Sequence, residues 1–254
     1  MSGRLIGVGT GPGDPELLTV KAVKALAAAE VVAHFAKAGR VGNARATVEG
    51  LLRPDAVELP LAYPVTTELP WQGADYGAAL AAFFAAASAA VEAHLAAGRT
   101  VAVLSEGDPL FYGSYMHLHV RLAPRWPAEV IPGVTAMSGC WSQAGLPLVQ
   151  GDDVLTVLPG TLDEPELVRR LLDSPASVIM KVGRNLARIR RALAATGKLE
   201  RAVYVERGTM ARTVTTPLSE KADDVAPYFS IVLVPGWERR PGAAAPAEAT
   251  EAAQ

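Results

Sequence analysis

Residues 7–22 read GVGTGPGDPELLTVKA and place a glycine-rich loop between an apolar strand and a helix. Such loops bind dinucleotides when their free backbone N–H groups point at a pyrophosphate. Here Pro12 removes one donor, and Asp14 puts a negative charge where a phosphate would lie. Glu30, the nearest candidate for the acid that binds a ribose, precedes the apolar pair Val31-Val32 instead of following a strand. The loop therefore suits a ligand without phosphates, or a tight turn with no ligand.

The composition excludes several classes of protein. The chain has 254 residues, half of them hydrophobic, and its formal charge of −2 argues against a basic nucleic-acid-binding face. Cys140 is the single cysteine, which rules out an intramolecular disulfide and fits a reducing cytoplasm. We expect it to be a small core residue, and the histidines show no metal-ligand spacing. The alanine-rich segment 78–91 is shorter than a membrane span, so we expect a buried or half-buried helix of a soluble protein.

Apolar, β-branched runs alternate with helical patterns along the chain, which is typical of α/β folds with largely parallel sheets. The expected strands are 5–8, 31–34, 56–59, 101–104, 129–131, 154–158, 178–181, 203–206 and 231–234, and residues 212–214 could form an antiparallel excursion beside 203–206. The expected helices are 15–28, 44–51, 74–97, 164–173, 185–195 and 220–225. A proline-rich joint at 122–128 predicts two α/β domains, 1–124 and 125–238, and residues 239–254 have the composition of a disordered tail.

Several small-residue segments follow strands, where ligands of open α/β sheets bind. In SEGDPLFYG (105–113), Gly107 permits close backbone approach, and Asp108 could bind ribose hydroxyls or cap a helix. In IPGVTAMS (131–138), Thr135 could cap a helix or bind a ligand. Met180 ends a strand and could fill the core or pack on a purine, and Gly208 is placed for close backbone approach. Each segment alone is a weak signal.

The order and spacing of GPGDPELLT, EGDP, PGVT, MKVG and ERGT resemble the tetrapyrrole (corrin/porphyrin) methylase family over about residues 3–236. The resemblance implies S-adenosylmethionine as cofactor, a tetrapyrrole as methyl acceptor, two α/β domains with the cofactor in the cleft between them, and usually a homodimer. This cofactor carries a sulfonium cation and no phosphate. The implied ligand therefore agrees with the conclusion that the first loop suits a ligand without phosphates.

The resemblance also assigns roles to individual residues. Pro12 would line the cofactor pocket, Glu106, Gly107 and Asp108 would hold the methionine and ribose portions, and Phe111 would pack nearby; Thr135 and Ala136 would meet the ligand from the domain joint, and Met180 and Gly208 would contact the adenine. At Glu106 relatives often have a second glycine, which favours a backbone contact there over a side-chain role.

The catalytic assignment stays open at the level of sequence. Tyr112 and His117 are weak candidates for reaching the substrate, although a structural role is the simpler interpretation of each histidine. Arginine suits tetrapyrrole carboxylates, and the candidates are Arg40, Arg45, Arg184 and Arg207, each of which could equally be a solvated surface residue. No general base is identified.

Two alternatives to a tetrapyrrole methyltransferase remain, and one question stays open within that family. A nicotinamide-dependent oxidoreductase would share the glycine-rich opening, but Pro12 and the missing ribose acid count against it. A binding protein without catalytic activity would share the fold. Within the family, the methylated ring carbon and the presence of cobalt in the substrate stay undecided.

Overall fold

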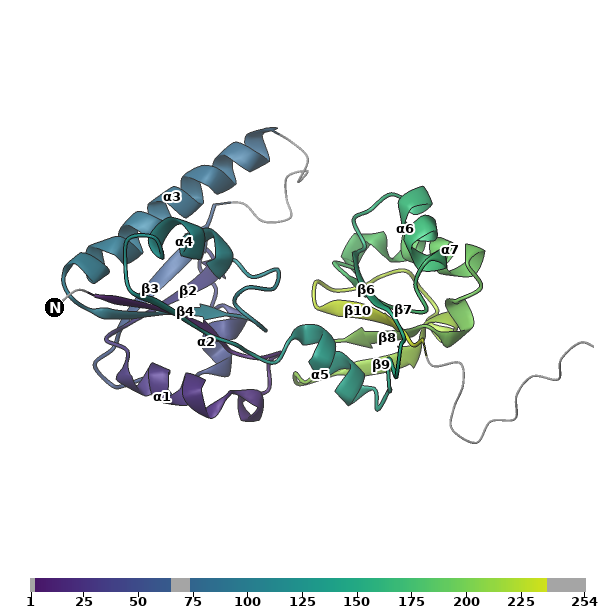
Figure 1. Cartoon of the computed structure of the whole chain (residues 1–254), viewed down its shortest axis with the longest axis horizontal. Helices are drawn as coiled ribbons and strands as arrows, with labels where there is room; N and C mark the ends of the chain where they lie inside the picture. Colours follow the sequence, from purple (N-terminus) through teal and green to yellow (C-terminus); the bar gives the residue numbers. More distant parts are fainter. Residues whose placement is uncertain (1–2, 65–73, 237–254) are drawn as a thin grey trace, which may run out of the picture. The chain divides into compact units, whose positions relative to one another are not determined.

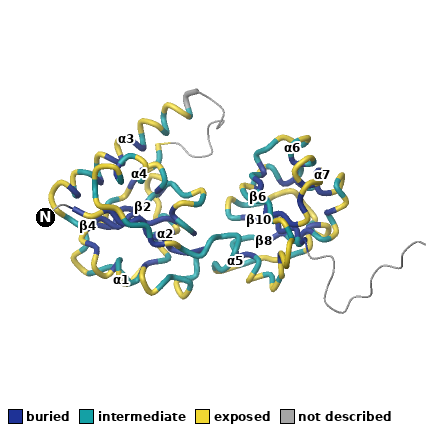
Figure 2. Tube along the Cα trace, viewed as in Figure 1, coloured by how far each residue is buried: buried dark blue, intermediate teal, exposed yellow. Residues whose placement is uncertain are grey.

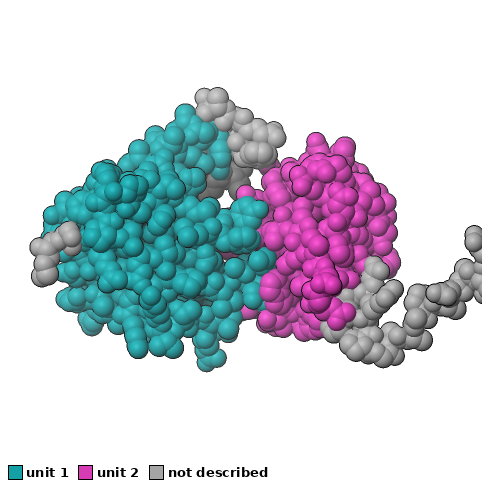
Figure 3. Space-filling model, viewed as in Figure 1, with its two compact units in different colours: residues 1–139 teal, residues 140–254 magenta. Residues whose placement is uncertain are grey.

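The structure, a computed structural model, describes residues 3–64 and 74–236 of the chain. The chain divides into two compact units, Met1–Gly139 and Cys140–Gln254 (Figures 1 and 3). Each unit contains one five-stranded sheet, which confirms the prediction of two α/β halves. The tail expected at 239–254 lies outside the described residues.

The first unit is built on a parallel sheet of strand order β3-β2-β4-β1-β5. Its strands are β1 (Arg4–Gly9), β2 (Val31–Lys37), β3 (Val57–Tyr63), β4 (Thr100–Ser105) and β5 (Ala128–Ile131). Helices α3 (Ala74–Ala96) and α4 (Tyr115–Leu122) cover one face, and α1 (Val20–Ala28) and α2 (Asn43–Thr47) cover the other (Figure 1). The central strand β4 is almost wholly buried between these layers (Figure 2).

The division between the units differs from the boundary expected at 124/125. Strand β5 hydrogen-bonds in parallel with β1, with Leu5 opposite Ala128. Residues 125–139 therefore fold with the first unit, and α5 (Ala136–Gln143) begins there and ends in the second. The proline-rich segment 122–128 is a connection between α4 and β5 within one unit, because proline also marks ordinary turns.

Helix α3 is unusually long and rich in alanine. By length and composition alone, Tyr76–Ala96 could cross a membrane, and it is the one such helix in the described part of the chain. Phe84, Val91 and Leu95 on this helix are buried in the core beneath α3 and α4. One side of α3 therefore packs on the sheet.

The second unit contains a mixed sheet of order β6-β7-β10-β8-β9. Its strands are β6 (Leu155–Pro159), β7 (Ala176–Met180), β8 (Val203–Glu206), β9 (Val214–Pro217) and β10 (Ser230–Val234), and α6 (Glu164–Leu172) and α7 (Leu186–Ala195) pack on its core. Strand β10 runs antiparallel to both β7 and β8, and β9 is the antiparallel excursion expected beside β8. The expectation of a largely parallel sheet is therefore corrected for this unit.

Three expected helices differ from the structure, and the one expected at 44–51 is the shorter α2, which ends at Thr47. The helix expected at 15–28 is a 3-10 turn (Pro15–Leu17) followed by α1, because Asp14 accepts a hydrogen bond from Glu16 N (2.9 Å) and Thr19 from Ala22 N (3.1 Å). Each side chain caps its own helical segment, so the helix is interrupted between Leu17 and Val20.

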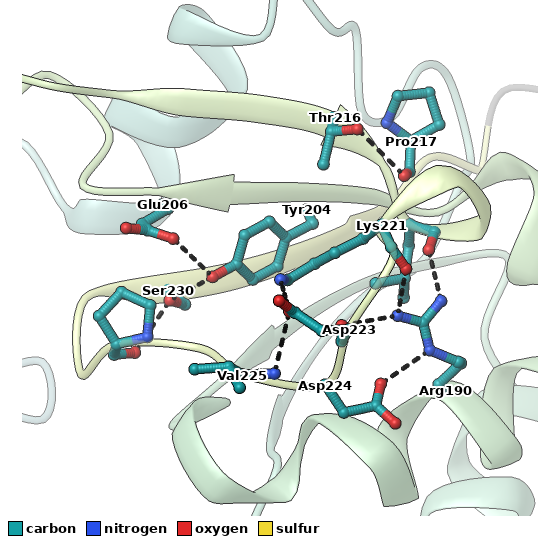
Figure 4. A network of polar contacts seen from close by, with 12 residues as sticks. Arg190, Tyr204, Glu206, Thr216, Pro217, Lys221, Asp223, Asp224, Val225 and Ser230 are labelled. Atoms are coloured by element: carbon teal, nitrogen blue, oxygen red, sulfur yellow. Dashed lines mark hydrogen bonds and ion pairs between the residues drawn. The ribbon is translucent and has the colours of Figure 1, made fainter.

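The helix expected at 220–225 is absent, and only a 3-10 turn, Leu218–Glu220, is present in that region. Arg190 of α7 donates hydrogen bonds to the carbonyl oxygens of Leu218 (2.6 Å), Lys221 (3.0 Å) and Asp223 (3.2 Å). Figure 4 shows Arg190 beside Lys221 and Asp223. These carbonyl groups would be the acceptors inside a helix. The guanidinium therefore holds the segment in an irregular conformation.

Candidate functional site

The loops after β1, β4 and β5 meet at the carboxyl edge of the first sheet. These three strands are neighbours in the order β4-β1-β5, and all run parallel. Gly11 N donates to Gly107 O (3.3 Å) and Gly107 N donates to Gly11 O (2.8 Å), which joins the first two loops. The fully buried Thr10 adds two bonds, from its N (2.9 Å) and its Oγ1 (3.1 Å) to Ser105 O. The structure thus brings together the first two motifs of the sequence.

Three glycines pack these loops against each other. A Cβ on Gly133 would lie 2.1 Å from Gly107 O, and a Cβ on Gly9 would lie 2.5 Å from Gly133 N. Gly107 itself has a φ of +63°, a backbone conformation that residues with a side chain rarely adopt. The glycines are therefore required by contacts between backbone segments, whether or not a ligand also approaches them.

Asp108 links two of the loops. Its Oδ1 accepts a hydrogen bond from Leu110 N (2.9 Å), and its Oδ2 accepts one from Gly133 N (3.1 Å). The first bond closes a turn, so the expected helix cap at Asp108 is wrong: the helix that follows, α4, begins only at Tyr115. The second bond ties the loop after β4 to the loop after β5. Each carboxylate oxygen has a further lone pair, so a contact with ribose hydroxyls remains a prediction.

Thr135, Ala136 and Pro12 complete the predicted part of the first unit. Thr135 Oγ1 accepts a hydrogen bond from Ser138 N (3.2 Å), so its capping role is confirmed, and Ala136 is the first residue of α5. Pro12 is buried in the loop after β1, which limits the surface that it can offer to a ligand.

Glu106 lies directly after β4, and the residue keeps exposed surface. Desolvation by the surrounding protein raises the pKa of its carboxyl group, and favourable interactions with Asn43 and Ala44 at the start of α2 oppose this effect. The preference for a backbone contact at Glu106 stays a prediction.

The two catalytic candidates lie in different surroundings. Tyr112 is 47% exposed, with a left-handed φ of 54°, and its ring packs edge-on against Phe111 at 4.9 Å. His117 stacks on Phe84 of α3 at 4.0 Å between ring centroids, and burial, followed by the charge of Arg121, lowers its pKa. His117 therefore packs α4 against α3, as the structural interpretation predicts.

The four arginine candidates for binding substrate carboxylates differ in their ion pairs and exposure. Arg45 makes a bidentate pair with Glu58, with both N–O distances 2.7 Å, and Arg207 Nη1 lies 3.2 Å from Glu206 Oε1. Arg40 and Arg184 are exposed. The pairing of Arg45 holds α2 to β3 and makes it the weakest of the four candidates for substrate binding.

A second group of site candidates lies at one edge of the second sheet. Strands β7 and β8 point the same way because both are antiparallel to β10, so Met180 and the loop at Gly208 share an edge. Gly160 N, from the loop after β6, donates to Met180 O (2.6 Å). The structure thus places both predicted adenine-contacting residues at one edge of this unit.

Backbone strain marks the same edge. Lys181 (φ 56°), Arg207 (φ 49°) and Thr209 (φ 67°) adopt left-handed conformations without being glycine. Such residues cost about 1–3 kcal/mol each and cluster at functional sites. Sequence reasoning missed Lys181 and Thr209, because a positive φ at a lysine or threonine leaves no signal in the sequence.

Gly208 is required by its contact with Cys140. A Cβ on Gly208 would lie 2.6 Å from Cys140 Sγ, and burial raises the pKa of this thiol to about 11, which fits the predicted core role. We expect Gly208→Ala to cost ~1–3 kcal/mol of unfolding free energy, typical of overpacking.

A double-mutant cycle measured by urea unfolding tests this contact. In the Cys140→Ala background the same Gly208→Ala change should cost less, because the sulfur atom is gone. Equal costs in the two backgrounds would show that the contact with the sulfur is not the cause.

Comparison with known proteins gives a consistent result. A family model described as tetrapyrrole (corrin/porphyrin) methylases matches residues 4–222. A protein of Sinorhizobium sp named precorrin-2 C(20)-methyltransferase is 74% identical over 94% of this chain and 98% of its own length. The cobalt-precorrin-2 C(20)-methyltransferase of Salmonella typhimurium is 31% identical over 94% of this chain and 99% of its own length. The solved structure of uroporphyrin-III C-methyltransferase from Thermus thermophilus, complexed with S-adenyl homocysteine, is 25% identical, covers 91% of this chain and 92% of its own, and has a TM-score of 0.63.

Proposed function

Since the chain belongs to the tetrapyrrole (corrin/porphyrin) methylase family, we propose that it methylates C-20 of precorrin-2 with S-adenosylmethionine, in cobalamin (corrin) biosynthesis. The proposal is carried by the 74% sequence identity to the Sinorhizobium precorrin-2 C(20)-methyltransferase, which extends over nearly the full length of both proteins. The order of the motifs, from the loop after β1 to the loop after β8, supports the same activity.

The loops of the first unit fit this cofactor better than a dinucleotide. The loops after β1 and β4 carry the carboxylates of Asp14, Glu106 and Asp108, which favour a cation and disfavour a pyrophosphate. Pro12 also withholds one of the N–H groups that a phosphate needs. Within the loops, Glu106, Gly107 and Asp108 would hold the methionine and ribose portions. In the second unit, Met180 and Gly208 would contact the adenine.

Positioning supplies most of the proposed catalysis. The cofactor, when bound, supplies a methyl group already activated by its sulfonium. The loops that meet at Gly11, Gly107 and Gly133 are held together by hydrogen bonds and close backbone contacts, and would orient the cofactor. Orientation of this kind can contribute about 7–11 kcal/mol to lowering a barrier.

The test is an incubation of the chain with precorrin-2 and S-adenosylmethionine labelled in its methyl group. We expect mass spectrometry to show one added methyl and NMR to place it at C-20. A methyl at another ring carbon would establish the related alternative. Cofactor binding without methyl transfer would indicate a binding protein, and binding of NADH at the same site would overturn the proposal.

A cobalt-containing substrate is the second candidate, because the Salmonella relative is named for cobalt-precorrin-2. The much higher identity to the Sinorhizobium protein favours the cobalt-free substrate. We therefore expect a higher kcat/KM for precorrin-2 than for its cobalt complex, measured side by side under anaerobic conditions.

We also propose that the protein is a cytoplasmic homodimer. The family resemblance supports the dimer, and the free thiol of Cys140 supports a reducing compartment. Light scattering after gel filtration would test the first, and cell fractionation the second.

A further inference from the structure

We propose that Thr209, in the loop after β8, binds the adenine base of S-adenosylmethionine through its side-chain hydroxyl. The inference rests on the proposed function and deepens it, because a hydroxyl would add a directed hydrogen bond to the adenine contacts proposed for Met180 and Gly208.

The hydroxyl of Thr209 is buried and unpaired. Its Oγ1 has no hydrogen-bond partner among the described residues, 3–64 and 74–236. A buried hydroxyl has lost its bonds to water, so leaving it unpaired disfavours the folded state. Such groups are few in native proteins, and a bound ligand is one way in which they gain a partner.

The backbone at Thr209 is also strained. Its φ of 67° lies in the left-handed region, where a β-branched residue is a genuine outlier. Ser88 and Ser177 also have buried, unpaired hydroxyls, but they lie within α3 and β7. In the described part of the chain, Thr209 is the only non-glycine residue in which a positive φ coincides with a buried, unpaired side-chain atom. Strained positions of this kind cluster at ligand sites, where the surrounding structure fixes them.

The contacts of the loop hold Thr209 in this conformation. Before it in the chain, Arg207 N donates a hydrogen bond to Phe229 O (2.8 Å). After it, Met210 N and Thr213 Oγ1 both donate to Arg207 O, each at 2.9 Å. The loop therefore closes around one carbonyl group, and the hydroxyl of Thr213 is part of that closure. The position of Thr209 is fixed by its neighbours and does not depend on its own hydroxyl.

Thr209 lies at the edge of the second sheet where Met180 ends β7. Strands β7 and β8 both pair with β10, and neighbouring strands lie about 4.8 Å apart, so the ends of β7 and β8 are roughly 10 Å apart. Met180 is half-buried, and its thioether is an adaptable packing surface for a flat base. Small-molecule sites usually combine such an apolar surface with a few placed polar groups. Met180 would therefore pack on the face of the base, and Thr209 would bond to its edge.

The hydroxyl matches the hydrogen-bonding groups of adenine. The edge of this base carries an amino donor and ring-nitrogen acceptors, and a hydroxyl can both donate and accept. Thr209 as a whole is half-buried, so rotation about its Cα–Cβ bond would bring the hydroxyl to the exposed part of the residue. This rotation breaks no hydrogen bond among the described residues. A bond to adenine is therefore gained without the loss of another.

Thr209→Val is the main test, because valine keeps the branched shape and removes the hydroxyl. We expect the Kd for S-adenosylhomocysteine, measured by calorimetric titration, to rise about three- to tenfold, the usual effect of one lost hydrogen bond. The midpoint of urea unfolding should stay the same or rise, because the variant no longer buries an unpaired hydroxyl. Thr209→Ser keeps the hydroxyl, and its Kd should stay within about twofold of wild type.

Analogues of S-adenosylhomocysteine altered only in the base test whether the hydroxyl meets adenine. The set lacks, one at a time, the exocyclic amino group or one of the ring nitrogens N1, N3 and N7. If Thr209 bonds to one of these groups, its removal should weaken binding to wild type more than binding to Thr209→Val. Equal losses in the two proteins for every analogue would overturn the assignment to the base.

Ser177→Ala is the matched control, since it removes another buried, unpaired hydroxyl near the start of β7, whereas Met180 is at its end. Its affinity should match wild type. An unchanged Kd in Thr209→Val would overturn the inference, and so would a loss of stability together with affinity, because the hydroxyl would then be structural. A wild-type chain that binds no S-adenosylhomocysteine would instead overturn the proposed function.

Discussion

Gly133→Ala is expected to destabilise the first unit and to abolish most of its cofactor affinity. The new Cβ would lie 2.1 Å from Gly107 O and 2.9 Å from Gly9 Cα, and both are backbone atoms that cannot move aside alone. We expect a loss of unfolding free energy at or above the upper end of the ~1–3 kcal/mol that overpacking costs. Such a loss is a large part of the roughly 5–15 kcal/mol that keeps a domain folded.

Urea unfolding and calorimetric titration with S-adenosylhomocysteine would measure the two effects. Gly77→Ala is the matched control, since a Cβ at that position in α3 meets nothing within 4 Å. It should raise stability by about 0.5–1 kcal/mol, because alanine favours a helix over glycine. A Gly133→Ala variant as stable as wild type would contradict the packing of the three glycines.

Most strands were predictable because their signal is local. The run of buried residues in β4 and in β10 appears in the sequence as short apolar segments bounded by polar residues. The direction of β10 was not predictable, since an apolar run is the same whether the strand pairs in parallel or antiparallel. The sheet of the second unit therefore proved mixed where parallel pairing was expected.

Helix boundaries were limited by competition between equivalent signals. Asp14 and Thr19 are both good N-caps, and the sequence alone favoured the first because Pro15 follows it. The helix expected at 220–225 was overridden by Arg190, which lies about thirty residues earlier in the chain and binds the segment through its carbonyl groups. No local pattern reports such a contact.

At the candidate site, too, local features could be predicted from the sequence and long-range contacts could not. The glycine-rich loop, Asp108 and Thr135 could be predicted as site residues from turn chemistry and resemblance. Their structural partners could not, because contacts such as that of Asp108 with Gly133 join residues far apart in the sequence. The helix cap expected at Asp108 is absent, because the chain forms a turn there and α4 begins only at Tyr115.

Asp108→Ala is the second variant for which we expect a large effect. It removes the acceptor for Gly133 N and Leu110 N, and an unpaired, partly buried N–H costs about 1–3 kcal/mol. If Asp108 also contacts the ribose, affinity for S-adenosylhomocysteine should fall tenfold or more, measured by calorimetry well below the unfolding temperature. Asp108→Asn should fall between, since its amide oxygen can replace only one of the two acceptors.

The control for Asp108 must lose a similar side-chain acceptor without approaching the proposed site. Asp163 is suitable, because its Oδ1 accepts a hydrogen bond from Glu166 N (2.9 Å) at the start of α6. Asp163→Ala should cost about 1 kcal/mol of stability and leave the affinity unchanged. If Asp108→Ala likewise lowers stability while the folded protein binds the ligand as tightly as wild type, then Asp108 serves only to join the two loops. The ribose must in that case be held by the backbone around Gly107.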